Sequence, residues 1–147
     1  MTIIVYRDGI MAADGGTWQG DVVVHSTAQK LIRLIDGRVI GCAGSRPDIE
    51  AYILWMQSGS SPAHKPPCDH LAERDFGAIV AYPGGLFDKV DYKFRSYAGI
   101  GPWAVEGCHT EFAHGALVMG ASADYAVRLA VKHCAYATGD VQIERVG

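Results

Sequence analysis

The second residue of the chain is a threonine, and a side chain this small normally permits removal of the initiator methionine. Removal of Met1 would leave Thr2 at the N-terminus, with a hydroxyl nucleophile and a free amine on adjacent carbon atoms. The amine titrates low enough to act as the base that activates the hydroxyl. This is weak support by itself, because many chains begin with Met-Thr for no catalytic reason. Thr2 is therefore a candidate nucleophile that needs support from other residues.

Two further groups of residues have types that could do chemistry. His64, Cys68 and His70 could form a metal site, but their spacing matches no familiar zinc pattern and no fourth ligand lies nearby in the sequence. We interpret the two histidines as surface residues. Cys108 and His109 could form a cysteine-protease pair, but adjacent side chains rarely point at one another. We expect neither a metal ion nor a cofactor.

The composition sets limits on the class of protein. A chain of 147 residues with 49% hydrophobic and 20% charged residues is expected to form one globular domain, over 1–147. The net charge of −3 and the lack of a basic patch argue against a nucleic-acid partner. The start, MTIIVYRDG, lacks the apolar run of a signal peptide, and no stretch approaches the roughly 18 apolar residues of a membrane span. We expect a cytoplasmic protein without a membrane partner, and reduced cysteines.

The first half of the chain is typical of antiparallel hairpins. Asp8-Gly9 and Asp36-Gly37 are tight-turn dipeptides between apolar runs, and Ser26-Thr27 separates two further runs, which predicts three successive hairpins. A glycine-rich segment over 15–20 is predicted to be a loop. The expected strands cover 3–6, 10–13, 21–25, 29–34 and 39–42.

The second half of the chain combines helices with further strands. Helical spacing of apolar residues predicts helices over 47–56, 112–119 and 125–132, the last two separated by Gly120. Strands are expected over 76–82, 85–87, 90–97 and 141–146, and an irregular connection over 58–67. Hairpins with helices in separate blocks favour an α+β layered domain over a doubly wound parallel sheet.

Five segments also resemble a known family. Four follow one another without large gaps in the first half: TIIVYRDGIMAAD, GGTWQG, QKLIRL and DGRVIGCAGS. The fifth, GCHTEFAHGALVMGASADYAVRLAV, lies near the C-terminus. Together they resemble HslV-type peptidases and proteasome β-subunits, which are N-terminal nucleophile hydrolases. The resemblance covers most of the chain apart from 58–73.

The resemblance implies a set of site residues. Thr2 matches the nucleophile, Asp14 the acid at the end of the second strand and Lys30 the buried basic residue. A lysine near the terminal amine disfavours the protonated amine, and an aspartate keeps that lysine charged and oriented. Gly44 matches the glycine whose N–H stabilises the oxyanion, where no side chain fits. Without the resemblance, Asp14 and Gly44 would be interpreted as turn residues and Lys30 as a solvated one.

Two positions depart from the family pattern. Cys108 lies where the family has a serine close to the nucleophile, and a thiol is the weaker hydrogen-bond donor. An acidic residue found after the last helix in related sequences is replaced near Cys134. These changes keep open a catalytically silent, proteasome-like structural subunit. A third alternative is an N-terminal nucleophile hydrolase that acts on small amides.

The fold and partners implied by the resemblance complete these expectations. The fold would be a four-layer αββα sandwich of two antiparallel sheets flanked by helices, and the reaction peptide-bond hydrolysis through an acyl-enzyme. A peptide or unfolded protein would bind as an extended strand beside the loop that holds Trp18 and the turn at Gly44. The resemblance also implies a homo-oligomeric ring, while an ATP-dependent unfoldase is a partner by analogy only.

Overall fold

Two antiparallel sheets face each other in the computed structural model, which describes residues 1–147. The first sheet has the strand order β10-β1-β2-β11, and the second has the order β5-β6-β7-β8-β9. The strands of the first sheet are β1 (Ile3–Arg7), β2 (Ile10–Ala13), β10 (Trp103–Gly107) and β11 (Gln142–Arg145). Those of the second are β5 (Leu31–Arg33), β6 (Val39–Gly44), β7 (Phe76–Ala81), β8 (Phe87–Val90) and β9 (Ser96–Ala98).

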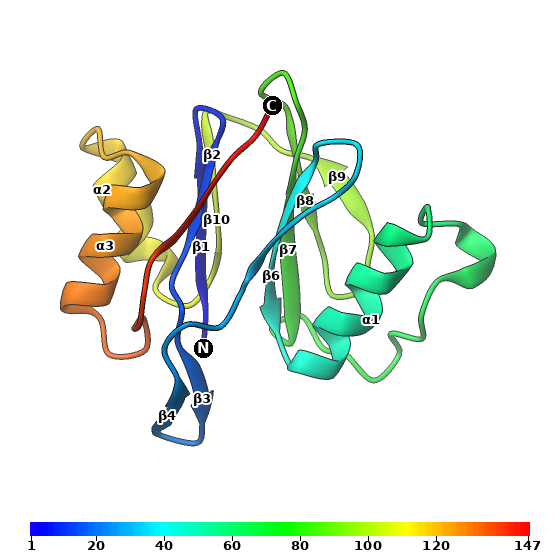
Figure 1. Ribbon diagram of the computed structural model, residues 1–147, viewed down its shortest axis with the longest axis horizontal. Coiled ribbons are helices and arrows are strands. Elements are labelled where there is room, and N and C mark those ends of the chain that lie inside the picture. Colours follow the sequence, from blue (N-terminus) through cyan, green and yellow to red (C-terminus); the bar gives the residue numbers. More distant parts are fainter.

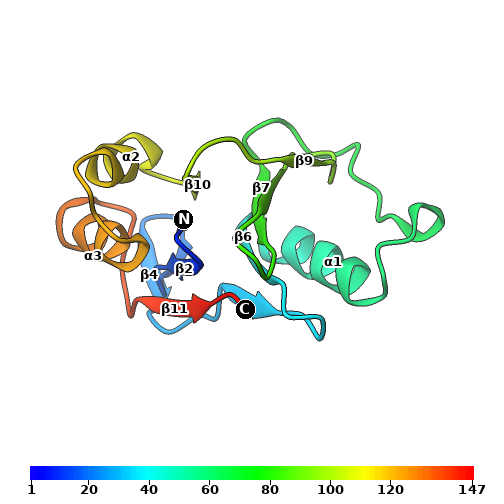
Figure 2. The same ribbon diagram turned by 90° about the horizontal axis from the view of Figure 1, so that it is seen from above.

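Helices cover the outer face of each sheet. Helices α2 (Thr110–Val118) and α3 (Ala123–His133) pack on the first sheet, while α1 (Arg46–Gln57) packs on the second (Figures 1 and 2). A 3₁₀ turn, Pro62–His64, follows α1. This is the four-layer αββα sandwich that the resemblance implied, so the predicted fold is confirmed. No helix has both the length and the apolar character needed to cross a bilayer.

Strand β1 shows why the sequence builds these layers. Its side chains alternate between the two faces of the first sheet. Ile4 and Tyr6 belong to the core between the sheets, whereas Ile3 and Val5 belong to the core beneath α2 and α3. All four are at most 2% exposed, which explains a continuous apolar run in place of an apolar–polar alternation.

The helix boundaries follow local sequence signals. Ser122 caps α3 by accepting a hydrogen bond from the backbone N–H of Tyr125 at 3.3 Å. Ser45 caps α1 in the same way through the N–H of Asp48. The buried residues of α3 recur at helical spacing, as Ala123, Ala126, Val127 and Ala130. The predicted helix pair separated by Gly120 is confirmed.

The hairpin predicted from strands over 21–25 and 29–34 is wrong. Strand β4 (Val22–His25) pairs instead with β3 (Thr17–Gln19), which lies in the segment expected to be a loop, and β5 pairs only with β6. Gly20 has a φ of 59° and supplies the tight turn between β3 and β4. Beyond β4 the carbonyl of Ser26 accepts from the N–H of Asp140, which ties this part of the chain to the C-terminal segment.

The strand predicted over 90–97 is also wrong, because the chain turns between β8 and β9. The carboxylate of Asp91 accepts hydrogen bonds from the backbone N–H groups of Lys93 and Arg95, a local turn that competes with an extended strand. Phe94 has a positive φ of 57° within this turn. Strand β10 was not predicted at all, although it completes the edge of the first sheet next to β1.

Candidate active site

Asp14 is the one fully buried charged residue of the chain, and it lies directly after β2. Its Oδ1 accepts hydrogen bonds from the backbone N–H of Ile3 at 3.0 Å and from Lys30 Nζ at 2.9 Å. Its Oδ2 accepts from the backbone N–H of Thr138 at 3.2 Å. Three donors therefore hold this carboxylate in one orientation at the start of β1.

Lys30 reaches the N-terminal segment from just before β5. Its Nζ donates to Asp14 and also to the carbonyl oxygen of Met1 at 3.1 Å, and its side chain is only 9% exposed. Burial lowers the pKa of Lys30, and the ion pair with Asp14 opposes that decrease. The Met1 carbonyl is part of the peptide bond to Thr2, so the structure places this ammonium group beside the predicted nucleophile.

The same charged groups affect the pKa of the N-terminal amine. Burial lowers its pKa, and Lys30 lowers it further, while Cys108 and Asp14 oppose the decrease. In this structure the amine belongs to Met1. A terminal amine in this environment is unprotonated to a larger extent at neutral pH than a solvated one, which suits it to the role of a base.

Cys108 lies on the other side of the N-terminal segment, just after β10. Its backbone N–H donates to the carbonyl oxygen of Thr2 at 2.7 Å. Its thiol faces the backbone carbonyl of Tyr136, with an Sγ to oxygen distance of 3.9 Å. Burial raises the pKa of this thiol, and Asp14 raises it further, so the thiol stays protonated and is a poor nucleophile near neutral pH.

Gly107 allows the chain to pass close to Thr2. It has a φ of 100°, and a Cβ at this position would collide with the carbonyl of Thr2. We expect Gly107→Ala to lower the free energy of unfolding by about 2 to 4 kcal/mol, measured by urea denaturation. Gly101→Ala is the matched control, because Gly101 has a φ of 94° but open space around it. The control isolates the backbone strain, about 1 kcal/mol, and an equal loss in both variants would contradict the close approach.

Gly44 is the last residue of β6 and comes from the opposite sheet. The end of β6 lies at the same end of the sandwich as the N-terminus (Figure 1). Gly44 is exposed and has a φ of 150°, and a Cβ there would lie 2.7 Å from the carbonyl oxygen of Asp75. The position therefore requires glycine, as an oxyanion role also would. Direct contacts join Asp14, Lys30 and Cys108 to the N-terminal segment, while Gly44 lies at the facing sheet end.

The segment after α3 contributes residues that the sequence did not identify. Thr138 binds Asp14 through its backbone N–H, and a Cβ on Gly16 would collide with the Thr138 side chain. The Gly15-Gly16 doublet could have indicated this close approach of two backbones. Cys134, near which the family's acidic residue is replaced, follows the last residue of α3 and donates its N–H to the carbonyl of Ala130.

An aromatic group flanks Cys108. Trp18 lies in β3 and packs edge-on against Tyr136 at a centroid distance of 5.4 Å. The ring of His109 is stacked on Tyr136 at 6.1 Å, and its Nε2 accepts from the Tyr136 backbone N–H at 3.3 Å. His109 has a positive φ of 53°, an uncommon conformation for a residue other than glycine. Trp18 therefore lies in a strand and not in the predicted loop, and it packs against Tyr136, whose backbone carbonyl faces the thiol of Cys108.

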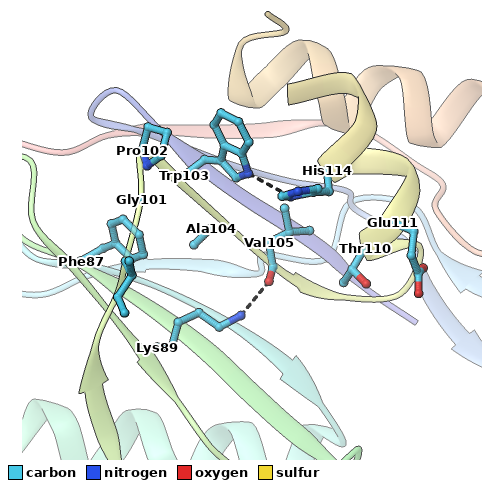
Figure 3. Close-up of a pocket in the computed structure, with 11 residues that line it drawn as sticks. Phe87, Lys89, Gly101, Pro102, Trp103, Ala104, Val105, Thr110, Glu111 and His114 are labelled. Atoms are coloured by element: carbon cyan, nitrogen blue, oxygen red, sulfur yellow. Dashed lines mark hydrogen bonds between the residues drawn. The ribbon is translucent and has the colours of Figure 1, made fainter. Parts of the chain in front are cut away.

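A cavity of about 640 Å³ lies elsewhere and is lined by residues of β8, of β10 and the segment before it, and of α2 (Figure 3). Lys89 crosses it to donate to the carbonyl of Val105 at 2.7 Å, and Trp103 donates to Nδ1 of His114 at 3.1 Å. None of the five predicted site residues lines this cavity. The predicted site residues therefore lie away from this cavity.

Comparisons with known proteins show similarity in structure. No protein-family model matches the sequence, and no curated protein matches it. The chain is similar to Thiobacillus denitrificans BPH, with a TM-score of 0.67, 18% identity and coverage of 99% of this chain and 98% of that one. It is also similar to the same protein in complex with epoxomicin, with a TM-score of 0.67, 17% identity and coverage of 99% of this chain and 98% of that one. Eukaryotic HslV from Trypanosoma brucei is similar as well, with a TM-score of 0.67, 20% identity and coverage of 98% of each chain. The chain therefore has the HslV-type fold along its whole length.

Proposed function

We propose that this chain is a subunit of a threonine-type peptidase whose nucleophile is Thr2, exposed when Met1 is removed. One observation carries the proposal: the buried ion pair of Lys30 and Asp14 lies against the peptide bond that joins Met1 to Thr2. Burying a lysine costs free energy unless the ammonium group is paired, and buried ionisable groups with shifted pKa values are concentrated at functional sites. The HslV-type fold supports the same conclusion.

The proposed reaction proceeds through an ester. The Thr2 hydroxyl oxygen attacks the carbonyl carbon of the substrate, and its proton passes to the Thr2 amine. The Gly44 N–H stabilises the resulting oxyanion. The protonated amine then gives its proton to the leaving nitrogen as the peptide bond breaks, which leaves an acyl group on Thr2. Water, deprotonated by the same amine, attacks the ester and releases the second product.

Lys30 and Asp14 set the electrostatics of these steps. In this structure burial and the positive charge of Lys30 both lower the pKa of the Met1 amine, and after removal of Met1 they would lower that of the Thr2 amine in the same way and keep it available as a base. The same charge stabilises negative charge that develops on the threonine oxygen. Asp14 holds Lys30 in its charged form, because its carboxylate opposes the effect of burial on the Lys30 pKa.

The proposed substrate is a peptide or an unfolded protein segment. It would bind as an extended strand between β3, which carries Trp18, and the end of β6 at Gly44, through main-chain hydrogen bonds. One of the similar structures holds epoxomicin. We also propose a homo-oligomeric ring, supported by apolar residues exposed on the projecting β3–β4 hairpin, where Val22 is 64% and Val24 45% exposed. Association with an ATP-dependent unfoldase and a cytoplasmic location are part of the same proposal by analogy.

A catalytically silent subunit is the second candidate, and Cys108 favours it. A thiol 3.9 Å from the Tyr136 carbonyl contributes little to a polar network beside the nucleophile. This candidate keeps the fold and the buried ion pair but predicts no covalent chemistry at Thr2. The third candidate, a hydrolase of small amides, predicts covalent chemistry at Thr2 without cleavage of peptides.

The deciding experiment is the intact mass of the purified chain before and after incubation with a peptide epoxyketone. This reagent bonds to both the hydroxyl and the amine of an N-terminal threonine, so we expect loss of Met1 and a single adduct. Fragmentation of the adduct should place it on the peptide that begins with Thr2. Retained Met1, or a processed chain that never forms the adduct, would support the silent subunit. An adduct on the peptide that contains Cys108 would refute Thr2 as the nucleophile.

A further inference from the structure

Gln142 connects three segments around the candidate site through its side-chain amide. It is the first residue of β11 and lies opposite Ala13, the residue before Asp14. Its Oε1 accepts from the backbone N–H of Lys30 at 2.8 Å. Its Nε2 donates to the carbonyl of Ala28 and, at 3.5 Å, to the carbonyl of Asp14. Both ends of the amide are therefore used, in an arrangement that only one orientation of the group satisfies.

The segment that these bonds hold has no strand partner. Residues 26–30 connect β4 to β5 outside any sheet. The N–H of Ala28 donates to the carbonyl of Gly15 at 2.9 Å, and the carbonyl of Ser26 accepts from Asp140 at 2.8 Å. At Lys30 itself, the backbone N–H is satisfied by Gln142 alone among the hydrogen bonds of the structure. The side chain of Gln142 thus replaces the ladder that would otherwise fix the backbone of Lys30.

The position of this backbone matters because Lys30 carries a long, flexible side chain. A lysine ammonium is a point charge on a stem with several rotatable bonds, so its place depends on where the stem is anchored. Lys30 Nζ lies within hydrogen-bond distance of both Asp14 and the Met1 carbonyl, and once Met1 is removed it must remain paired with Asp14 beside Thr2. A displacement of a catalytic group by about 1 Å can reduce a rate about 100-fold.

We propose that Gln142 is a positioning residue, which fixes the backbone at Lys30 so that the lysine ammonium lies beside the N-terminal threonine. The inference rests on the proposed function, because it gives Lys30 its role there. Gln142 does not contact the nucleophile and acts only through Lys30. Its place 112 residues after Lys30 in the sequence makes this connection a property of the fold.

The test compares Gln142→Ala with Gln29→Ala in the full-length chain. Gln29 is the matched control, because it lies in the same segment, is exposed and binds only the nearby Leu31 carbonyl. We expect Gln142→Ala to reduce the maximal rate of modification by a peptide epoxyketone about 10- to 100-fold, with the reagent's binding constant unchanged. Gln29→Ala should match the unsubstituted chain in both quantities. Gln142→Met keeps the bulk of the side chain and provides the same test if the alanine variant folds poorly.

A second measurement does not need enzymatic activity. The pH dependence of reductive methylation of the terminal amine reports the pKa of that amine, which faces Lys30, Asp14 and Cys108. A displaced Lys30 lowers this pKa less, so the pKa should rise in Gln142→Ala and Gln142→Met but not in Gln29→Ala. If it is the same in all variants, the inference is wrong. If it rises but no chain forms an adduct, the positioning role stands and the proposed peptidase activity fails.

Discussion

Thr2→Ala is expected to abolish covalent modification by a peptide epoxyketone and any peptide hydrolysis, a loss of at least about 1,000-fold. The substitution removes the hydroxyl but keeps the terminal amine, Lys30 and Asp14. Met1 should still be removed from this variant, because the side chain of alanine is even smaller than that of threonine. Intact mass and release of a fluorescent group from a model peptide measure the two losses.

The fold of Thr2→Ala should be unchanged, which makes the result interpretable. The contact of Thr2 with Cys108 uses the backbone carbonyl, which alanine retains. We therefore expect the free energy of unfolding to change by less than about 1 kcal/mol. Thr2→Ser is the matched control, since it keeps the hydroxyl and the amine and should still form the adduct. Modification of Thr2→Ala at the rate of the unsubstituted chain would move the nucleophile to another residue.

The sequence predicted much of the fold, because several of its signals are local. The apolar run Ile3 to Tyr6, the Asp8-Gly9 turn and the helix pair around Gly120 each specify one element through neighbouring residues. The order of these elements, together with the resemblance of five segments, then led to the αββα sandwich. The pairing of Asp14 with Lys30 was also predicted, and the structure contains this ion pair, while the catalytic roles of the two residues stay predictions.

Contacts between distant segments could not be predicted in this way. Thr138 lies 124 residues from Asp14 and binds it through a backbone N–H, which carries no sequence signature. Gln142 likewise binds the backbone of Lys30 across most of the chain. Hydrophobic periodicity indicates which face of an element is buried but not which segment lies against it. The contacts that Thr138 and Gln142 make at the candidate site are therefore seen only in the folded chain.

Strand β10 shows a different reason for failure. Its inward-facing Glu106 forms an ion pair with Lys89 at 2.6 Å, between the two sheets. A Cβ on Gly77 of the facing sheet would collide with the Glu106 side chain, so a glycine makes room for it. An interior carboxylate reverses the usual apolar–polar alternation, and Pro102 precedes the strand. A pattern search for buried strands consequently passes over this segment.

Asp14→Asn is expected to have the largest effect on stability and a large effect on modification. The amide has nearly the shape of the carboxylate, but it carries no negative charge. Its N–H₂ group is a donor and must face one of the N–H donors that the carboxylate binds. Asp14 Oδ1 accepts from Ile3 and Lys30, so rotating the amide to satisfy these two donors turns its nitrogen toward the N–H of Thr138. We expect the free energy of unfolding to fall by about 3 to 5 kcal/mol, because a buried charge loses its partner. Urea denaturation measures this loss.

The effect on modification follows from the charge of Lys30. Burial already lowers the pKa of Lys30, and Asp14 is the first group that opposes it, so the pKa falls further in Asp14→Asn. A neutral Lys30 no longer stabilises the negative charge that develops on the threonine oxygen, and without the Asp14 carboxylate its side chain is no longer held beside the N-terminus. We expect the rate of epoxyketone modification to fall at least about 100-fold in the fraction that remains folded.

Asp36→Asn is the control for Asp14→Asn, because Asp36 also pairs with a basic residue, Arg38, but at the exposed turn between β5 and β6. It should leave the modification rate unchanged and affect stability far less. The two variants remove the same charge and differ only in burial and in the groups that the carboxylate holds. If Asp14→Asn kept both the stability and the rate of the unsubstituted chain, the buried ion pair would have no role in holding Lys30 charged. The observation on which the proposed function rests would then describe a structural contact and not a catalytic one.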